Sequence, residues 1–442
     1  MKSVRIRKVE QGLAGTLTFP GDKSLSHRAI IFGALAEGTS SFTNVLWGED
    51  CACTRRAFES LGVRIESKSP TELTIHGKGL HSLKAPKGEI YLGNSGTSMR
   101  LLLGILAGNK FEATLTGDPS LSSRPMRRVT DYLKQMGAQF EGRENANFAP
   151  IRVRGGNLKA IDAKLPISSA QVKSAILLAG LYAAGKTSVT EPEKSRDHTE
   201  RFLKYFGAKI EEGGNTVSIE GGQNLKAGSF AIAGDISSAA FFMAMSLLVP
   251  ESALTFKSVL DNPTRTGILR ILERAGVHFS NYHSAADGGA AGPEPVADFS
   301  LGAQPLKAFH VRKEELPALI DEIPVLTVLA TQAKGRTVIH DADELRVKET
   351  DRIESMTKGL SRMGAKVRAE GNTLIVEGPT PLRGAAVDSY KDHRTAMSLI
   401  VAGMIAQGET TVRDVECIDT SFPGFFELLK ASGVRYQMID TP

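Results

Sequence analysis

The sequence has few of the features that would assign it to several large protein classes. It contains three cysteines among 442 residues. Cys51 and Cys53 are too close together for an ordinary disulfide bridge, so we expect a reducing compartment and no disulfide framework. The chain has no charge-free run of 18 apolar residues, and no apolar segment follows the basic residues 1–10. Neither a membrane-spanning helix nor a secretory signal is predicted, and a cytoplasmic protein is expected.

Strong charge patterns and metal-ligand patterns are missing too. The net charge of +5 is small for this length and gives no reason to expect nucleic-acid binding. The nine histidines show no His-x-x-x-His spacing and the cysteines no Cys-x-x-Cys spacing, so no metal site is predicted. The remaining composition, 41% hydrophobic and 23% charged, is typical of a globular protein. Because one core stops growing at roughly 250–300 residues, two domains are expected.

One unit repeats six times along the chain. Six glycines each follow an amphipathic helical pattern and precede a strand-like segment, as a glycine at a helix C-terminus does. Most are about 70 residues apart, and such near-equal intervals indicate an internal repeat. One longer interval contains residues 283–298, a segment rich in Gly, Ala and Pro that is interpreted as a loop insertion. The six glycines are Gly62, Gly137, Gly207, Gly276, Gly364 and Gly433.

A second series of helices runs in phase with the first. These segments are apolar on nearly every side, which predicts buried helices. They begin near Ser24, Thr97, Ser169, Ser237, Glu322 and Asp392. Each unit is therefore predicted to run strand, buried helix, strand, amphipathic helix, strand, strand. The fold class is predicted as α/β, with two domains of three such βαβαββ units each.

The domain boundary is expected between the third and fourth units. We assign residues 21–235 to one domain and residues 236–442 to the other. Residues 1–20 are assigned to the second domain as well, because a strand-like segment at residues 3–8 comes before Pro20 and Gly21. The chain would then cross between the domains near residues 20 and 235. Two crossovers make a hinge, and a ligand-binding cleft between the domains is predicted.

Residues 345–353 are interpreted as the first turn of an amphipathic helix, because apolar residues at helical spacing follow them. This interpretation places Lys348 and Arg352 near a helix N-terminus, where the helix dipole disfavours cations. A compensating anion is therefore expected. It is either a neighbouring carboxylate, such as Glu349, or a bound ligand.

Cations and hydroxyl groups are predicted at other helix starts as well. Arg124, for example, comes directly before Pro125, which suits the first position of a helix. Each residue alone is explained by a solvated surface, but their joint placement favours a site for two small anions. The residues concerned are Lys23, Ser24, Arg28, Gly96, Arg124, Ser169, Gln171 and Arg196.

Two carboxylates are candidates for moving protons. Asp321 precedes Pro324 at the start of a buried helix, and capping that helix is its alternative role. Glu349 lies between Lys348 and Arg352. Cations keep such a carboxylate ionised and ligand phosphates would push its pKa back up, which suits a group that both gives and takes a proton.

Seven short motifs follow one another along nearly the whole chain. They occupy residues 20–28, 92–97, 124–126, 169–171, 345–352, 392–394 and 422–423. Several are specific to one family, and together they make the sequence similar to the 5-enolpyruvylshikimate-3-phosphate synthases, or 3-phosphoshikimate 1-carboxyvinyltransferases.

The resemblance implies an α/β fold of two domains with three βαβαββ units each, an inside-out α/β barrel, with the active site in the interdomain cleft. It implies transfer of the enolpyruvyl group of phosphoenolpyruvate to the 5-hydroxyl of shikimate 3-phosphate through a tetrahedral intermediate. Both substrates are anions, which accounts for the cationic helix starts without a metal or another cofactor. A monomer without nucleic-acid or membrane partners is expected.

The motifs also imply roles for single residues. The implied contacts to phosphoenolpyruvate are Lys23, Gly96, Arg124, Gln171, Arg352 and Arg394. The implied contacts to shikimate 3-phosphate are Ser24, Arg28, Ser169, Gln171, Arg196, Asp321 and Lys348. The implied catalytic residues are Lys23, Asp321 and Glu349, of which the two carboxylates transfer protons.

The sequence departs from the family pattern at two positions. Ala170 stands where many members have a second serine, and Thr420 where many have a lysine near phosphoenolpyruvate. Together with Arg196 and Asp197, both departures resemble a bacterial subclass with members that tolerate the herbicide glyphosate. Gly96 leaves room beside phosphoenolpyruvate, so inhibition by glyphosate is still expected.

Two other functions are kept as alternatives. A UDP-N-acetylglucosamine enolpyruvyl transferase has a similar fold but uses a cysteine in a mobile loop, and residues 116–123 contain none. A non-catalytic anion-binding protein would keep the cations but would not need Asp321 and Glu349.

Overall fold

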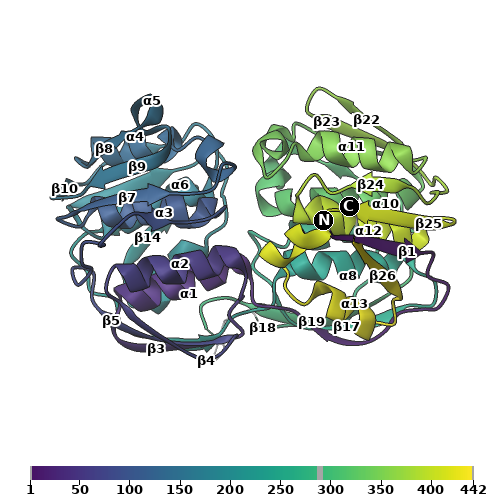
Figure 1. Ribbon diagram of the computed structural model, residues 1–442, viewed down its shortest axis with the longest axis horizontal. Helices are drawn as coiled ribbons and strands as arrows, with labels where there is room; N and C mark the ends of the chain where they lie inside the picture. The colour runs from purple at the N-terminus through teal and green to yellow at the C-terminus, as the bar shows by residue number, and fades with distance from the viewer. Residues whose placement is uncertain (1, 286–291, 441–442) are drawn as a thin grey trace. The chain divides into compact units, whose positions relative to one another are not determined.

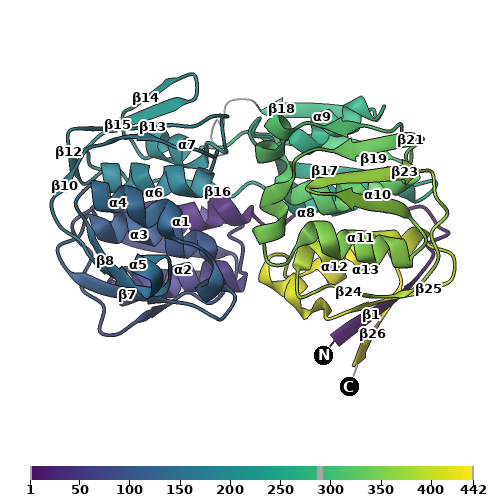
Figure 2. The same ribbon diagram turned by 90° about the horizontal axis from the view of Figure 1, so that it is seen from above.

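The chain forms two compact units in the computed structural model, which describes residues 2–285 and 292–440. Of these residues, unit 1 contains 2–20, 233–285 and 295–440, and unit 2 contains 21–232 and 292–294. The first and last described residues, Lys2 and Asp440, lie opposite each other in two paired strands of unit 1 (Figures 1 and 2). The chain returns to unit 2 for residues 292–294, which the sequence analysis did not anticipate.

Unit 2 has helices at its centre and strands around them (Figure 1). Its helices are α1 (Lys23–Leu35), α2 (Glu49–Ser60), α3 (Gly96–Ala107), α4 (Arg127–Gln135), α6 (Ala170–Gly180) and α7 (His198–Tyr205), with the 3₁₀ turn η1 (Leu121–Ser123) and the left-handed turn α5 (Arg143–Ala146). Its strands are β3 (Glu37–Thr43), β4 (Arg64–Ser69), β5 (Glu72–Lys78), β6 (Ile90–Tyr91), β7 (Glu112–Thr116), β8 (Gln139–Gly142), β9 (Phe148–Arg154), β10 (Leu158–Lys159), β11 (Asp162–Lys164), β12 (Ala183–Ala184), β13 (Lys186–Thr190), β14 (Ile210–Gly213), β15 (Thr216–Glu220) and β16 (Ser229–Ala231).

Unit 1 follows the same plan. Its helices are α8 (Ile236–Leu248), α9 (Gly267–Arg274), α10 (Ile323–Gln332), α11 (Arg352–Arg362), α12 (His393–Ile405) and α13 (Phe425–Ala431), with the 3₁₀ helices η3 (Lys313–Ala318), η4 (Ile320–Glu322), η5 (Asp343–Val347) and η6 (Val415–Thr420). Its strands are β1 (Lys2–Arg7), β2 (Ala14–Thr18), β17 (Ala253–Leu260), β18 (Ser280–Ala285), β19 (Val296–Gly302), β20 (His310–Val311), β21 (Gly335–Ile339), β22 (Lys366–Glu370), β23 (Thr373–Gly378), β24 (Ala386–Asp388), β25 (Glu409–Arg413) and β26 (Tyr436–Asp440).

Six four-stranded sheets among the described residues share one pattern of strand pairing. Each has a parallel pair at one edge, followed by two antiparallel pairs. The strand orders are β16-β3-β5-β4, β6-β7-β9-β8 and β11-β13-β15-β14 in unit 2, and β2-β17-β19-β18, β20-β21-β23-β22 and β24-β25-β1-β26 in unit 1. The predicted α/β class with repeated units is therefore confirmed.

The predicted strand order within a unit holds fully for the second, third and fifth repeats. In each of the others, one strand comes from a distant part of the chain. Strand β16 completes the first sheet, β2 the fourth and β1 the sixth. The predicted N-terminal strand, now β1, pairs with both β25 and β26, so it is a central strand of its sheet.

The predicted C-terminal ends of the amphipathic helices are confirmed. Each of the six marker glycines has a positive φ, between 88° and 110°, which a residue with a side chain rarely adopts. Five of the buried helices begin with a side chain that accepts a hydrogen bond from a first-turn N–H. The capping residues are Asp22, Ser95, Ser169, Asp235 and Asp392.

The buried helices of each unit pack on one another. Helix α3 contacts α1 and α6, and α8, α10 and α12 contact each other. At Gly104 of α3, a Cβ atom would lie 2.2 Å from the carbonyl oxygen of Ala175 in α6. This approach is possible only without a side chain at residue 104.

Two local predictions were wrong. Residues 283–285 and 296–298 belong to paired strands, with His283 opposite Asp298, so the predicted loop is shorter; its centre, residues 286–291, lies outside the described residues. Helix α4 begins at Arg127, and Pro125 is not its first residue.

No helix of the described chain is long and apolar enough to span a bilayer.

The segment at residues 345–353 is not the first turn of a helix. Helix η5 ends at Val347, the chain is irregular from Lys348 to Thr350, and α11 begins at Arg352. The missed signal is Asp351, whose side chain caps α11 by accepting the N–H of Glu354 at 3.0 Å. Lys348 is therefore not stacked on the helix with Arg352.

Candidate functional site

In unit 2, the first turns of α1 carry Lys23, Ser24 and Arg28. Lys23 and Ser24 are half-buried, and Lys23 Nζ lies 3.2 Å from a carboxylate oxygen of Asp50. The Arg28 guanidinium donates a hydrogen bond back to the carbonyl oxygen of Ser24, at 3.0 Å. The structure therefore brings these three predicted site residues together.

Arg28 is held rigidly by neighbours from two other helices. Its Nε donates to Thr199 Oγ1 at 2.8 Å and its Nη2 donates to Ser174 Oγ at 2.9 Å. Burial lowers the pKa of Arg28 to about 10, and the charges of Glu200 and Glu294 partly oppose this shift. Arg28 is still a cation at neutral pH, and its neutral hydrogen-bond partners leave that charge available to an anion.

The start of α3 brings a second cation close to backbone N–H groups. Arg124 donates to both the side-chain and the backbone oxygen of Asn94, just before the helix. A Cβ atom at Gly96 would lie 3.4 Å from Arg124 Nη1 and 3.0 Å from Arg100 Nη1. The absence of a side chain at residue 96 therefore lets two guanidinium groups approach the start of the helix closely.

The third buried helix of unit 2, α6, contributes Ser169 and Gln171. Ser169 caps the helix, and its hydroxyl oxygen accepts the N–H of Val172 at 3.4 Å. The side-chain oxygen of Gln171 accepts a hydrogen bond from Arg100, and its nitrogen donates to Thr97 Oγ1 at 2.9 Å. Gln171 thus connects the starts of α3 and α6, both of which carry predicted site residues.

Arg196 lies near the start of α7, two residues before the first helical residue, His198. It is half-buried and follows the buried Ser195. Helix α7 also carries Thr199, which binds Arg28. The turn with Arg196 is thus connected through α7 to the Arg28 side chain.

In unit 1, Arg352 is the centre of a buried ion-pair cluster. Its side chain is 1% exposed. Its Nε donates to Asp392 at 2.8 Å, its Nη2 to Glu349 at 2.7 Å, and its Nη1 to Asp321 at 3.2 Å. Burial alone lowers the pKa of Arg352, but the charges of Asp392, Glu349 and Asp321 outweigh it and raise the pKa. Arg352 is permanently charged.

Arg394, on the first turn of α12, approaches the same cluster. Its Nε lies 3.7 Å from Asp321 Oδ1, and its Nη1 donates to the Asp321 backbone oxygen at 3.2 Å. Lys348 is half-buried and directly precedes Glu349 in the chain. The structure therefore places the five predicted residues of unit 1 on neighbouring segments. The compensating anion that the sequence analysis expected beside Arg352 is therefore a set of neighbouring carboxylates.

The sequence analysis missed several residues that hold the candidate site together. Asp50 pairs with Lys23, Asn94 binds Arg124, and Arg100 binds Gln171. Asp392 was predicted only as part of a helix start, but it also forms the most buried pair with Arg352. Arg100 could have been found, because it closes a glycine-rich segment at residues 93–100 that also contains Gly96.

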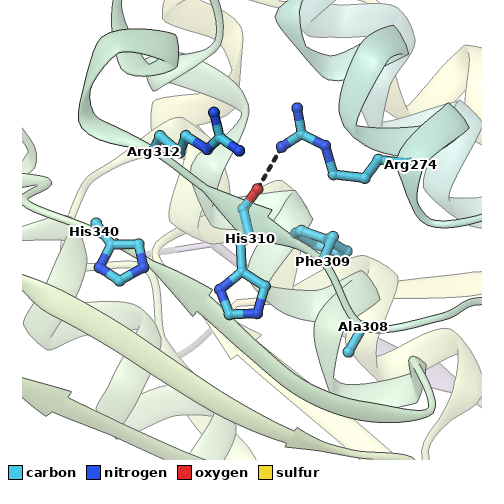
Figure 3. Close-up of a pocket in the computed structure, with 6 residues that line it drawn as sticks. All are labelled: Arg274, Ala308, Phe309, His310, Arg312 and His340. Atoms are coloured by element: carbon cyan, nitrogen blue, oxygen red, sulfur yellow. Dashed lines mark hydrogen bonds between the residues drawn. The ribbon is translucent and has the colours of Figure 1, made fainter.

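A separate pocket does not involve the candidate site residues described above. A pocket of about 400 Å³ in unit 1 is lined by Arg274, Ala308, Phe309, His310, Arg312 and His340 (Figure 3). Arg274 donates to the His310 backbone oxygen there and is neutralised by Glu315. Within the described residues, no group of three or more His, Cys, Asp or Glu side chains is arranged to hold a metal ion.

Comparison with known proteins gives consistent matches over almost the whole chain. The family model of EPSP synthase (3-phosphoshikimate 1-carboxyvinyltransferase) matches residues 8–429. A 3-phosphoshikimate 1-carboxyvinyltransferase of Shouchella clausii is 49% identical over 96% of this chain and 98% of its own length. One of Bacillus anthracis is 48% identical over 97% and 99%.

Solved structures agree with these matches. An EPSP synthase from Acinetobacter baumannii is 43% identical, covers 100% of both chains and has a TM-score of 0.89. The enolpyruvyl transferase NikO from Streptomyces tendae, 18% identical over 100% of this chain and 99% of its own, has a TM-score of 0.79 and shows the shared fold alone. The chain belongs to the EPSP synthase family, the 3-phosphoshikimate 1-carboxyvinyltransferases.

Proposed function

We propose that this chain transfers the enolpyruvyl group of phosphoenolpyruvate to the 5-hydroxyl of shikimate 3-phosphate, using Asp321 and Glu349 as the proton-transfer groups. Full-length identity of 49% to a 3-phosphoshikimate 1-carboxyvinyltransferase supports the reaction. The assignment of roles is supported by the candidate site, where permanently charged cations and carboxylates occur side by side.

The two substrates need different partners. We assign shikimate 3-phosphate to Ser24, Arg28, Ser169, Gln171, Arg196, Asp321 and Lys348. We assign phosphoenolpyruvate to Lys23, Gly96, Arg124, Gln171, Arg352 and Arg394. Guanidinium groups suit this task because they bind carboxylates and phosphates through two parallel hydrogen bonds. Gly96 has no side chain that could come between an anion and the Arg100 and Arg124 guanidinium groups at the start of α3.

The reaction needs proton transfer in both of its steps. In the addition step, a base takes the proton of the 5-hydroxyl while an acid protonates the methylene carbon, and the hydroxyl oxygen bonds to the adjacent carbon of phosphoenolpyruvate. In the elimination step, a proton leaves the new methyl group and the bond to the phosphate oxygen breaks. Inorganic phosphate is released and the double bond is restored. Lys23, paired with Asp50, supplies positive charge to the phosphate oxygens as charge develops there.

One observation carries the assignment of the proton-transfer groups. Both Asp321 and Glu349 bind the same buried guanidinium, that of Arg352, so their positions are fixed relative to each other. Asp392, the third partner, is fully buried and caps α12. Asp321 and Glu349 are 16% and 27% exposed, which leaves them accessible to a substrate.

The test is substitution of Glu349 by Gln, which keeps the size of the side chain. Turnover should fall about 100-fold or more, because general acid–base groups contribute about 10² to 10⁴. Binding of shikimate 3-phosphate, measured by calorimetry, should change by no more than a few-fold. The control is Glu354→Gln, since Glu354 is a nearby exposed carboxylate in the first turn of α11 that pairs with Lys358. Near-normal turnover of Glu349→Gln would exclude Glu349 as a proton-transfer group.

We also propose that the protein is a cytoplasmic monomer. The three cysteines are free, which agrees with a reducing compartment. Light scattering of the purified protein should give a mass close to 47.4 kDa, that of one chain. A mass of twice this value would contradict the monomer.

A further inference from the structure

A buried carboxylate outside the assigned site, Glu191, joins two segments that carry assigned substrate contacts. It follows strand β13, and its side chain is 2% exposed. One oxygen accepts the backbone N–H of Ser169 at 2.9 Å. The other accepts the Ser195 hydroxyl at 2.8 Å and the Ser195 backbone N–H at 3.3 Å. Both oxygens are thus used to hold the chain just before α6 and just before Arg196.

The charge of Glu191 is balanced by Lys173, one turn into α6. Lys173 Nζ lies 2.7 Å from Glu191 and 2.8 Å from Glu200, and its side chain is 3% exposed. Burial lowers the pKa of Lys173, but the charges of Glu200 and Glu191 outweigh it and raise the pKa. Lys173 also donates to the Ser195 backbone oxygen at 3.4 Å. Lys173 thus lies between two carboxylates. Glu191 and Lys173 both bind Ser195, so the turn at Ser195 is held by two partners.

Each of the two held segments presents a group to the phosphorylated substrate. With its backbone N–H bound by Glu191, Ser169 has its hydroxyl proton available for donation, because among the described residues its hydroxyl oxygen only accepts, from the N–H of Val172. Arg196 directly follows the fixed Ser195. A shift of either segment by a fraction of an ångström would lengthen the hydrogen bonds to a bound phosphate.

We propose that Glu191 is a positioning residue for shikimate 3-phosphate, which holds Ser169 and Arg196 in place for the substrate phosphate. The proposal rests on the substrate contacts assigned above. Glu191 touches neither the substrate nor the reacting atoms. Its effect is therefore on affinity for one substrate, and the chemical step and phosphoenolpyruvate binding depend on other residues.

The cluster itself provides the matched control. Glu200 binds the same Lys173 but neither Ser169 nor Ser195, and one of its oxygens has no hydrogen-bond partner in the described part of the chain. Burial raises the pKa of Glu200, so a neutral side chain is tolerated there more easily than at Glu191. In Glu191→Gln, by contrast, the new amide nitrogen is a hydrogen-bond donor and would face other donors. These would be either the Ser169 N–H, or Lys173 together with the N–H and hydroxyl groups of Ser195.

The experiment compares the steady-state kinetics of Glu191→Gln and Glu200→Gln in the full-length enzyme. Glu191→Gln should raise the KM for shikimate 3-phosphate about 10-fold or more, since a charge-assisted hydrogen bond is lost. Its KM for phosphoenolpyruvate and its kcat should stay within about 3-fold of wild type. Glu200→Gln should leave all three values within about 3-fold. Equal effects of both variants, or an unchanged KM in Glu191→Gln, would overturn the proposal.

A milder variant keeps the test valid if Glu191→Gln does not fold. Ser195→Ala removes one hydrogen bond from an uncharged donor to Glu191 and should raise the KM for shikimate 3-phosphate about 2- to 10-fold. An unchanged KM in this variant would count against the proposal. The wild-type enzyme separates the two claims: if it shows no turnover with shikimate 3-phosphate, the proposed function fails, whereas wild-type turnover with no KM effect in the variants refutes only the role of Glu191.

Discussion

Substitution of Asp392 by Asn should destabilise unit 1 strongly without uncapping its helix. One Asp392 oxygen accepts the N–H groups of Arg394 and Thr395 at 2.8 and 3.2 Å, and the other accepts Arg352 Nε at 2.8 Å. Asparagine caps helices as well as aspartate does, so the cap is kept. Its amide nitrogen, however, would face the Arg352 guanidinium, and two donors would oppose each other in a site with no access to water.

The size of the effect follows from the burial of the pair. Asp392 is 0% and Arg352 1% exposed, and removing one partner of a buried ion pair costs about 3–5 kcal/mol. Asp321 and Glu349 still compensate Arg352, so we expect the lower end, about 3 kcal/mol. This corresponds to roughly a 100-fold loss of protection against amide exchange in α12.

A second aspartate of unit 1 provides the control for this substitution. Asp351 also caps a helix, α11, and also binds an arginine, Arg346, at 2.6 Å. This pair is 26% and 36% exposed, so Asp351→Asn should cost no more than about 1 kcal/mol. Hydrogen–deuterium exchange of peptides from α11 and α12 measures both variants. Equal losses of protection in the two variants would refute the argument from burial.

Three further predictions concern unit 2 and the inhibitor. Burial lowers the pKa of His27 from 6.5 to about 4, so the unfolded chain binds the proton more tightly than the folded chain does. The free energy of unfolding should therefore fall by about 3 kcal/mol as the pH drops from 6.5 to 4. Urea titrations followed by Trp47 fluorescence measure this fall, and it should be smaller in His27→Asn. Gly104→Ala, whose Cβ would lie 2.2 Å from Ala175 O, should cost about 2 kcal/mol or more in the same assay, whereas Gly156→Ala, with no atom within 4 Å, should be close to neutral. Millimolar glyphosate should inhibit phosphate release, and an unchanged rate would show that the space at Gly96 is not sufficient for its binding.

Local signals made the helices predictable. The marker glycines and the polar residues before the buried helices act within one turn of chain, and the structure has the helix ends where these signals predicted them. The error at residues 345–353 had a local cause too. The apolar spacing suggested an early start, but the capping side chain of Asp351 sets the start at Arg352.

Features that depend on distant contacts could not be predicted. Strands β16, β2 and β1 complete sheets whose other strands lie far away in the sequence, and their short patterns carry no information about the partner. The same holds for the partners of the candidate site residues. Nothing in the local sequence connects Asp50 with Lys23, or Glu191 with Ser169, because only the tertiary fold brings them together.

The central claim is that this member of the EPSP synthase family acts on shikimate 3-phosphate. The most direct measurement is phosphate release from phosphoenolpyruvate by the purified protein, with shikimate 3-phosphate, with UDP-N-acetylglucosamine and with neither acceptor. We predict release that requires shikimate 3-phosphate. Release that requires UDP-N-acetylglucosamine, or no release with either acceptor, would contradict the claim.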